Sequence, residues 1–232
     1  ARLAAVERGV DELAERDRKL DVVVLNAGVV PREARRTADG LDESFQVNFL
    51  SNVLFVRRLA ERNLFAKGGQ RAARVVVVSS ESHRGPTSID FDAFGRFRPW
   101  TLRDAVAQYG YVKLLLQAFT EELARRWRGR ISVHSLCPGA VHTDIGREAP
   151  SWAKPLLALT MRAFFVAPEK AALPVAYLAA SHEIEGDSGV YLHATRRSAP
   201  SALALDAGTG GEVWERSERL LGDLGYTFEE AK

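Results

Sequence analysis

The stretch Arg74-Val-Val-Val-Val-Ser79-Ser80 is a short, apolar, β-branched run that ends in two hydroxyl side chains. The run Asp21-Val-Val-Val-Leu-Asn26-Ala27-Gly28 upstream and the run Arg130-Ile-Ser-Val-His-Ser-Leu-Cys137-Pro138-Gly139 downstream have the same form. Continuous apolar strands separated by helical stretches are typical of a parallel sheet that helices cover on both faces. The sequence therefore predicts an α/β fold with a doubly wound parallel sheet.

Polar or small residues follow each of these three strands at the point where the strand ends. Ligands of open α/β sheets bind outside the carboxyl ends of the strands. We therefore expect a binding site at this edge of the sheet, formed by residues 26–28, 79–80 and 137–139.

The rest of the chain is consistent with one domain over residues 1–232. The length allows a proper core, and no linker, repeat or low-complexity segment is visible. Hydrophobic periodicity and turn residues predict helices at residues 1–18, 41–65, 102–127, 151–164, 168–181 and 211–222, and strands at 22–26, 74–79, 131–136 and 190–192.

Tyr109 and Lys113 stand four residues apart, on one face of the predicted helix and one turn from each other. A nearby cation favours the charged form of a phenol, so Lys113 is expected to lower the pKa of Tyr109. A tyrosine tuned in this way can exchange a proton with an alcohol oxygen. Taken alone, the same pair means little, because tyrosine and lysine are common on solvated helix faces.

An ordered set of motifs runs along almost the whole chain. Its members are Leu25-Asn26-Ala27-Gly28, Asp39-Gly40-Leu41, Phe45-Gln-Val-Asn48, Val78-Ser79-Ser80-Glu81-Ser82-His83-Arg84, Ile89-Asp90-Phe91-Asp92, Tyr109-x-x-x-Lys113, Pro138-Gly139-x-x-x-Thr143, Ser188-Gly189-x-Tyr191 and Trp214-Glu-Arg-Ser217-Glu. The set resembles the short-chain dehydrogenase/reductase superfamily, and within it the retinol dehydrogenase-like and WW domain-containing oxidoreductase-like branch. The resemblance implies a Rossmann-like fold and NAD(P)-dependent interconversion of an alcohol and a carbonyl.

The resemblance also implies catalytic roles. Tyr109 would be the proton donor or acceptor, and Lys113 would tune it and hold the nicotinamide ribose. Ser80 would hydrogen-bond the substrate oxygen, although Ser79 could take this role, or Ser80 could only satisfy loop backbone. Asn48 would create a helix irregularity that seats a water in a proton relay to Lys113; otherwise it is a locally bonded amide.

Cofactor contacts follow from the same resemblance. Asn26, Ala27 and Gly28 would shape the adenine-side wall, Pro138 and Gly139 would form a rigid turn beside the nicotinamide, and Thr143 would bind its carboxamide. The resemblance favours NADP as the cofactor, with NAD as the other possibility. The five histidines show no ligand spacing, so no metal site is expected.

One part of the family pattern is missing. The first strand and the Gly-rich turn that normally holds the cofactor pyrophosphate do not occur, and the chain opens in the helix before the family's fourth strand. We therefore expect a piece of a longer enzyme in which residues 22–25 form a bare apolar edge. The alternative is an inactive truncated remnant that acts as a protein-binding module.

Composition argues against a nucleic-acid-binding protein and against a disulfide-stabilised one. A formal net charge of +2 gives no case for a nucleic-acid partner. A single cysteine excludes an internal disulfide, and with no visible signal peptide we expect a reducing, cytoplasmic location.

Residues 155–167 form an apolar stretch that is too short to span a bilayer. It could be a buried or partner-facing helix, a lid over a lipophilic substrate, or a helix on a membrane surface. The helices at 41–65 and 102–127 would provide a homodimer surface, by resemblance only.

Overall fold

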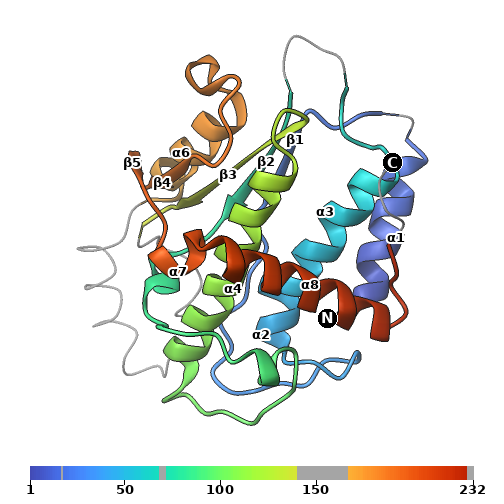
Figure 1. The fold of residues 1–232 in the computed structure, drawn as a ribbon, viewed down its shortest axis with the longest axis vertical. Helices are drawn as coiled ribbons and strands as arrows, with labels where there is room; N and C mark the ends of the chain where they lie inside the picture. Colours follow the sequence, from blue (N-terminus) through green and yellow to red (C-terminus); the bar gives the residue numbers. More distant parts are fainter. Residues whose placement is uncertain (17, 68–71, 140–166, 229–232) are drawn as a thin grey trace.

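The computed structural model describes residues 1–16, 18–67, 72–139 and 167–228 (Figure 1). Its five-stranded sheet has the order β1 (Val22–Leu25), β2 (Ala73–Val78), β3 (Ile131–Cys137), β4 (Tyr191–His193) and β5 (Arg196–Ser198). The first four strands are parallel, and β5 is antiparallel to β4. The predicted α/β fold with a mostly parallel sheet is confirmed, whereas β5 was not predicted.

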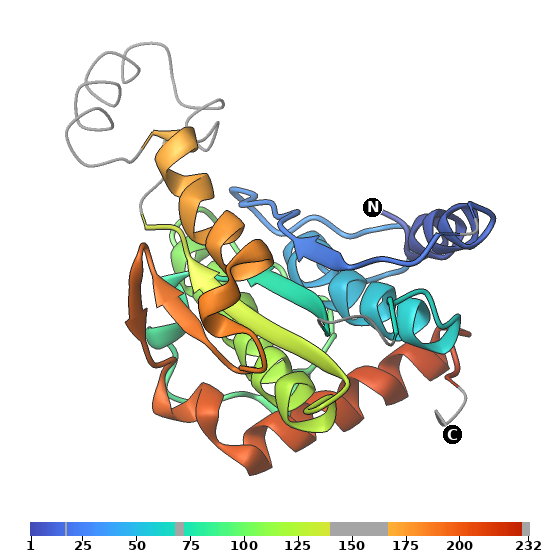
Figure 2. The same ribbon diagram turned by 90° about the horizontal axis from the view of Figure 1, so that it is seen from above.

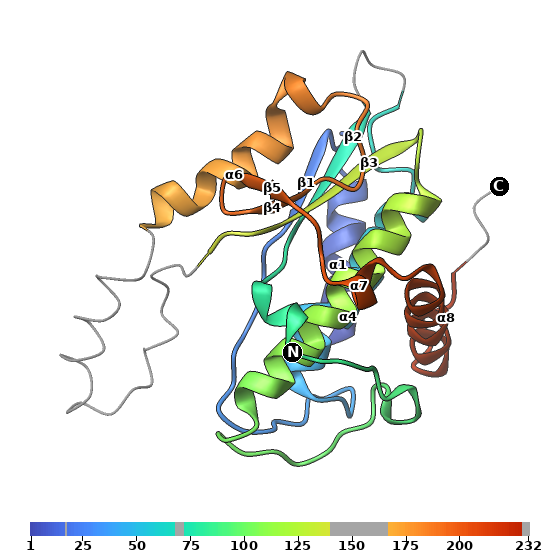
Figure 3. The ribbon, with the colours of Figure 1, turned by 60° about the vertical axis from the view of Figure 1, so that its left-hand side comes forward.

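Helices lie on both faces of the sheet (Figures 2 and 3). The helical elements are α1 (Leu3–Ala14), α2 (Glu43–Phe45), η1 (Gln46–Leu50), α3 (Ser51–Glu61), η2 (Glu81–Arg84), η3 (Phe91–Ala93), α4 (Ala105–Arg126), α6 (Pro168–Ala180), η5 (His182–Ile184), α7 (Ala202–Leu205) and α8 (Ala207–Asp223). The helix predicted at 151–164 lies outside the described residues. In the described part, no helix is both long and apolar enough to cross a membrane.

The side chains of β2 point alternately to the two faces of the sheet, and they contribute to two separate hydrophobic clusters. Val75 and Val77 belong to the larger one, with residues of α1, α3, α4 and α8, while Val76 belongs to a smaller one under α6. Successive side chains of a strand point to opposite faces, so a continuous valine run can serve both layers at once.

The single helix predicted at 41–65 is interrupted. Asp42 caps α2 by accepting the Phe45 N–H at 3.0 Å, and the chain then passes through the π-helical turn η1 before α3 begins. Asn48 lies within η1, so the irregularity expected at this residue is present. The Asn48 side chain donates to Ser44 Oγ one turn earlier at 3.0 Å and also bonds to Val29, as described below.

Helix α8 lies across the outer side of α4 and α3 (Figure 1). The Trp214 ring stacks on Phe119 at 5.3 Å between centroids, and the guanidinium groups of Arg57 and Arg126 lie over the same ring. Arg57 also pairs with Glu218 at 2.6 Å. Helix α8 therefore covers part of the two long helices that we expected to provide a homodimer surface, and the homodimer itself stays a prediction.

Strand β1 lies at one end of the sheet. It pairs with β2 alone among the described strands, and Val22 and Val24 are 38% and 41% exposed. The bare apolar edge that we expected at residues 22–25 is therefore present.

Candidate active site

A cavity of about 1320 Å³ opens at the carboxyl ends of β1, β2 and β3. Eight of the predicted site residues line it: Asn26, Ala27, Gly28, Ser80, Tyr109, Lys113, Pro138 and Gly139. Of the other two, Asn48 is not among the lining residues, and Thr143 lies outside the described part of the chain. The structure thus places most of the predicted residues around one space, where the parallel topology predicted it.

The close packing of α4 against η2 brings Tyr109 next to Ser80. At Gly110, an added Cβ would stand only 2.8 Å from the Ser82 carbonyl oxygen. Contacts this short are not tolerated, so only glycine permits this approach. The sequence analysis missed Gly110, although a glycine directly after a candidate catalytic residue, inside a helix, was the available signal.

Lys113 places a buried cation under the cavity. Its side chain is 5% exposed, and Nζ donates a hydrogen bond to the Val78 carbonyl oxygen at 2.9 Å. Burial lowers the pKa of Lys113 to about 8. An ammonium has three N–H donors, so it retains capacity for hydroxyl groups of a ligand in the cavity.

Tyr109 differs from the sequence-based expectation. Burial raises the pKa of its phenol, and a hydrogen bond with Ser80 opposes this by a smaller amount. The Lys113 ammonium lies 5.7 Å from the centroid of the tyrosine ring, over its face. The prediction that Lys113 lowers this pKa is wrong for this structure, because desolvation outweighs any effect of the cation.

Two serines compete for the role of substrate-binding hydroxyl. Ser80 interacts with Tyr109. Its Oγ also accepts the Ser82 N–H at 3.2 Å, thereby capping η2, and lies 3.1 Å from Ser82 Oγ, to which it donates. Ser79 Oγ is buried and forms no hydrogen bond in the described part of the chain. Contact with Tyr109 favours Ser80, while the backbone-capping role is present as well.

Asn48 supports the cavity wall from behind. Its Oδ1 accepts the Val29 N–H at 2.7 Å, and its Nδ2 donates to the Val29 carbonyl at 2.8 Å. Gly28 makes this possible, since a Cβ there would stand 2.9 Å from Asn48 Oδ1. The Asn48 carbonyl accepts a hydrogen bond from Asn52 Nδ2 at 2.9 Å, and the water relay to Lys113 stays a prediction.

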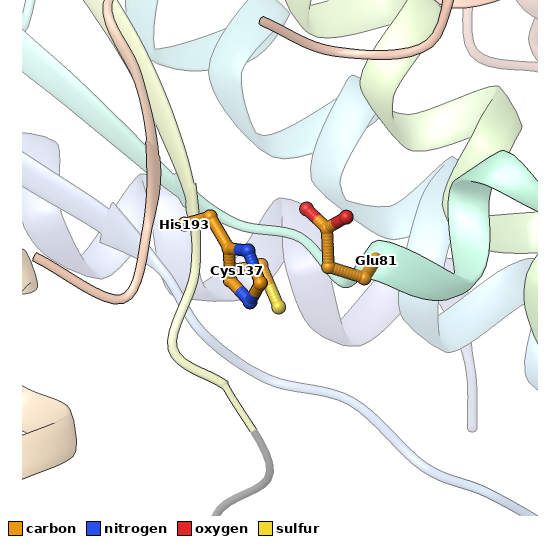
Figure 4. A group of neighbouring side chains, drawn as sticks. All are labelled: Glu81, Cys137 and His193. Carbon is orange, nitrogen blue, oxygen red and sulfur yellow. The ribbon is translucent and has the colours of Figure 1, made fainter. Parts of the chain in front are cut away.

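Glu81, Cys137 and His193 form a polar cluster beside the cavity (Figure 4). Their potential ligand atoms lie within 4.8 Å of one another. Glu81 is already engaged on both oxygens, which accept the Tyr191 hydroxyl and Arg84 Nε, each at 2.6 Å. The Arg84 cation lowers the attraction of this carboxylate for a metal ion, and the expectation of no metal site stays a prediction.

The cavity also has charged and apolar walls. Arg32 and Arg35 bring positive charge to the β1 side. Five residues at the start of α6 form an apolar wall: Pro168, Ala171, Ala172, Val175 and Ala176. A cavity with apolar walls and a few convergent polar groups is typical of a small-molecule site.

The short chain dehydrogenase family matches residues 1–88. The chain is 34% identical to a WW domain-containing oxidoreductase of Drosophila melanogaster over 230 residues, covering 96% of this chain and 53% of that protein. It is 33% identical to retinol dehydrogenase 14 of Homo sapiens over 227 residues, covering 97% and 65%. The chain thus spans between about half and two thirds of the length of these relatives.

Solved structures with a similar fold point to the same family. A crystal structure of an uncharacterized protein from Mycobacterium paratuberculosis superposes with a TM-score of 0.70 and 25% identity, covering 99% of this chain and 74% of that one. With the sheet, the cavity and these likenesses together, the chain belongs to the short-chain dehydrogenase/reductase family of oxidoreductases.

Proposed function

We propose that the protein is an NAD(P)-dependent oxidoreductase that interconverts an alcohol and a carbonyl. The observation that carries the proposal is the meeting of Ser80, Tyr109 and Lys113 around one cavity at the carboxyl edge of the sheet. These three residues supply a hydrogen-bond donor, a proton carrier and a fixed cation, as such a reaction requires.

In the direction of reduction, Tyr109 donates its proton to the carbonyl oxygen. Its raised pKa keeps the phenol protonated at neutral pH, which suits this role. In oxidation the phenolate accepts the alcohol proton, and the Ser80 hydrogen bond favours that charged form. Ser80 holds the substrate oxygen within reach of Tyr109.

The residues of the cavity fit a nicotinamide cofactor, NADP or NAD. The buried Lys113 ammonium has N–H donors that suit ribose hydroxyls, and residues 26–28 and 138–139 offer small, close walls. The cofactor, when bound, supplies or accepts the hydride. The apolar α6 wall supports a lipophilic substrate. The segment 155–166, for which a lid over such a substrate was one of three possible roles, lies outside the described residues.

Binding of NADPH and NADH to the purified 232-residue chain, followed by fluorescence titration, tests the cofactor assignment. Saturable binding, with turnover on a panel of lipophilic aldehydes and ketones, is expected. A folded chain that binds neither nucleotide would contradict the proposal for this chain.

A second candidate is a non-catalytic protein-binding module, and the exposed edge of β1 favours it. Among the described strands β1 pairs with β2 alone, so its other edge can pair with an added strand. Lack of nucleotide binding, together with capture of a defined partner strand at β1, would support this alternative.

A further inference from the structure

His83 is completely buried in η2, and both of its ring nitrogens are hydrogen-bonded. Nδ1 lies 2.5 Å from the Ser80 carbonyl oxygen, and Nε2 lies 3.0 Å from the Ser201 backbone nitrogen. Ser80 and Ser201 are 121 positions apart in the chain, so this imidazole links the strand end that carries Ser80 to the segment before α7.

These two partners define one protonation state. The Ser201 N–H is a donor, so Nε2 must be an acceptor, and the Ser80 carbonyl is an acceptor, so Nδ1 must carry the proton. An imidazolium would turn Nε2 into a second donor and place it against the Ser201 N–H. Only the neutral Nδ1–H tautomer satisfies both contacts.

The surroundings keep the ring in this state. The Tyr191 ring meets it edge-on at 5.7 Å between centroids. Burial lowers the pKa of His83; the hydrogen bond to the Ser80 carbonyl opposes this by a smaller amount, and the Arg84 cation lowers the pKa further. Arg84 Nη2 also donates to the Ala199 carbonyl at 2.5 Å, so two adjacent residues of η2 hold the same distant segment.

We propose that neutral His83 is a positioning residue for Ser80: it fixes the Ser80 main chain from behind, so that the Ser80 hydroxyl is held against Tyr109. This inference rests on the proposed function, because the catalytic roles of Ser80 and Tyr109 come from there. The physical claim about Ser80 and Tyr109 can be tested without any turnover.

The readout is the pKa of Tyr109, measured by ¹⁹F NMR in protein that carries 3-fluorotyrosine, which is more acidic than tyrosine and titrates where the fold survives. Each tyrosine signal is assigned with a Tyr→Phe variant. Ser80→Ala should raise the Tyr109 pKa on the order of one unit, the value of one lost hydrogen bond. Tyr111 is the internal control, because it lies on the same helix and should not shift.

His83→Ala should raise the Tyr109 pKa in the same direction. The double variant Ser80→Ala/His83→Ala should add nothing to Ser80→Ala, because both changes remove the same hydrogen bond. Additive shifts would contradict the proposal, as would a Tyr109 pKa that His83→Ala leaves unchanged. If Ser80→Ala left the Tyr109 pKa unchanged, there would be no hydrogen bond between Ser80 and Tyr109 for His83 to position.

Two amide variants separate positioning from simple anchoring. Asn places an N–H where Nδ1 lies and can still donate to the Ser80 carbonyl, whereas Gln places its oxygen near the Nε2 position and can accept only from Ser201. His83→Asn should keep the Tyr109 pKa close to that of the unmodified protein, and His83→Gln should shift it as His83→Ala does. The reverse ranking would show that His83 only anchors the segment before α7.

These variants also keep the test valid if His83→Ala fails to fold, which circular dichroism would show. Failure of the proposed function is a separate outcome: a chain that binds no nucleotide could still show the Tyr109 shifts, and an active enzyme could lack them. The His83 tautomer gives one further check, because its ¹⁵N shifts should report Nδ1–H without titration while the protein is folded.

Discussion

The two halves of α4 serve opposite purposes. The N-terminal half carries Tyr109 and Lys113, and it touches η2 through Gly110. Burial of the Lys113 charge lowers the pKa of this lysine and therefore costs stability at neutral pH. The C-terminal half carries Phe119, which is buried against Trp214 of α8. One half of this helix therefore serves the proposed chemistry at a cost in stability, and the other half stabilises the fold. Substitutions in the first half should mainly change activity, and those in the second half should mainly change the free energy of unfolding.

Tyr109→Phe should have the largest effect on function and the smallest on the fold. Loss of a positioned proton carrier is expected to reduce kcat by between about 10² and 10⁴-fold, while the free energy of unfolding changes little, since the ring remains. Steady-state kinetics and urea unfolding measure the two. Tyr111→Phe is the matched control; an active Tyr109→Phe enzyme would remove Tyr109 from proton transfer.

Trp214→Ala should show the opposite signature. Removing a buried indole that stacks on Phe119 and lies under two guanidinium groups should lower the free energy of unfolding by about 3–5 kcal/mol. The residual folded enzyme should retain its nucleotide affinity. Trp214→Phe, which keeps an aromatic ring, should lose less; equal losses would show that the stacked ring is not the source of the stability.

Lys113→Met should stabilise the protein and abolish activity. A pKa of about 8 in the fold, against about 10.4 when unfolded, means that burial of the charge costs about 3 kcal/mol at neutral pH. Replacing the lysine should remove this cost, but it also removes the hydrogen bond to the Val78 carbonyl, which stabilises the fold by about 1 kcal/mol. Urea unfolding at pH 7 should therefore show a net gain of about 2 kcal/mol.

The sign of the pH dependence follows from the same pKa. Between pH 8 and about 10.4 the unfolded chain binds more protons at this lysine than the folded one, so its penalty disappears as pH rises through that window. The difference in stability between Lys113→Met and the unmodified protein should shrink from pH 8 upward and stay constant below it. A difference that is constant from pH 7 to 10 would mean that Lys113 keeps an ordinary pKa.

Gly110→Ala should change the free energy of unfolding less than Trp214→Ala or Lys113→Met does. Alanine gains about 1 kcal/mol of helix propensity, but its Cβ would press on the Ser82 carbonyl, at a cost of about 1–3 kcal/mol. The net loss of about 1 kcal/mol should come with a disproportionate loss of kcat, because η2 and Ser80 must move away from Tyr109. Gly222→Ala, where no heavy atom stands near the added Cβ, is the control; unchanged kcat in Gly110→Ala would show that this contact does not position the site.

Local patterns accounted for most of the fold. The valine runs marked β1 and β2 to within one residue, and the helix expected at 102–127 corresponds to α4. The spacing of Tyr109 and Lys113 placed both on one helix face, and strand ends identified the edge where the cavity lies. The three residues of β5 and the four of α7 were too short to leave a periodic signal.

What the tertiary structure alone decided is the environment of those residues. The pKa of Tyr109 moved against the expectation from its neighbour in sequence, because desolvation depends on everything packed around the ring. The partner of His83, the cover that α8 forms on α4, and the engagement of Asn48 with Val29 all join positions distant in the chain. Periodicity and spacing act over one turn or one strand and can be read from sequence, whereas burial and long-range hydrogen bonds exist only once the chain has folded.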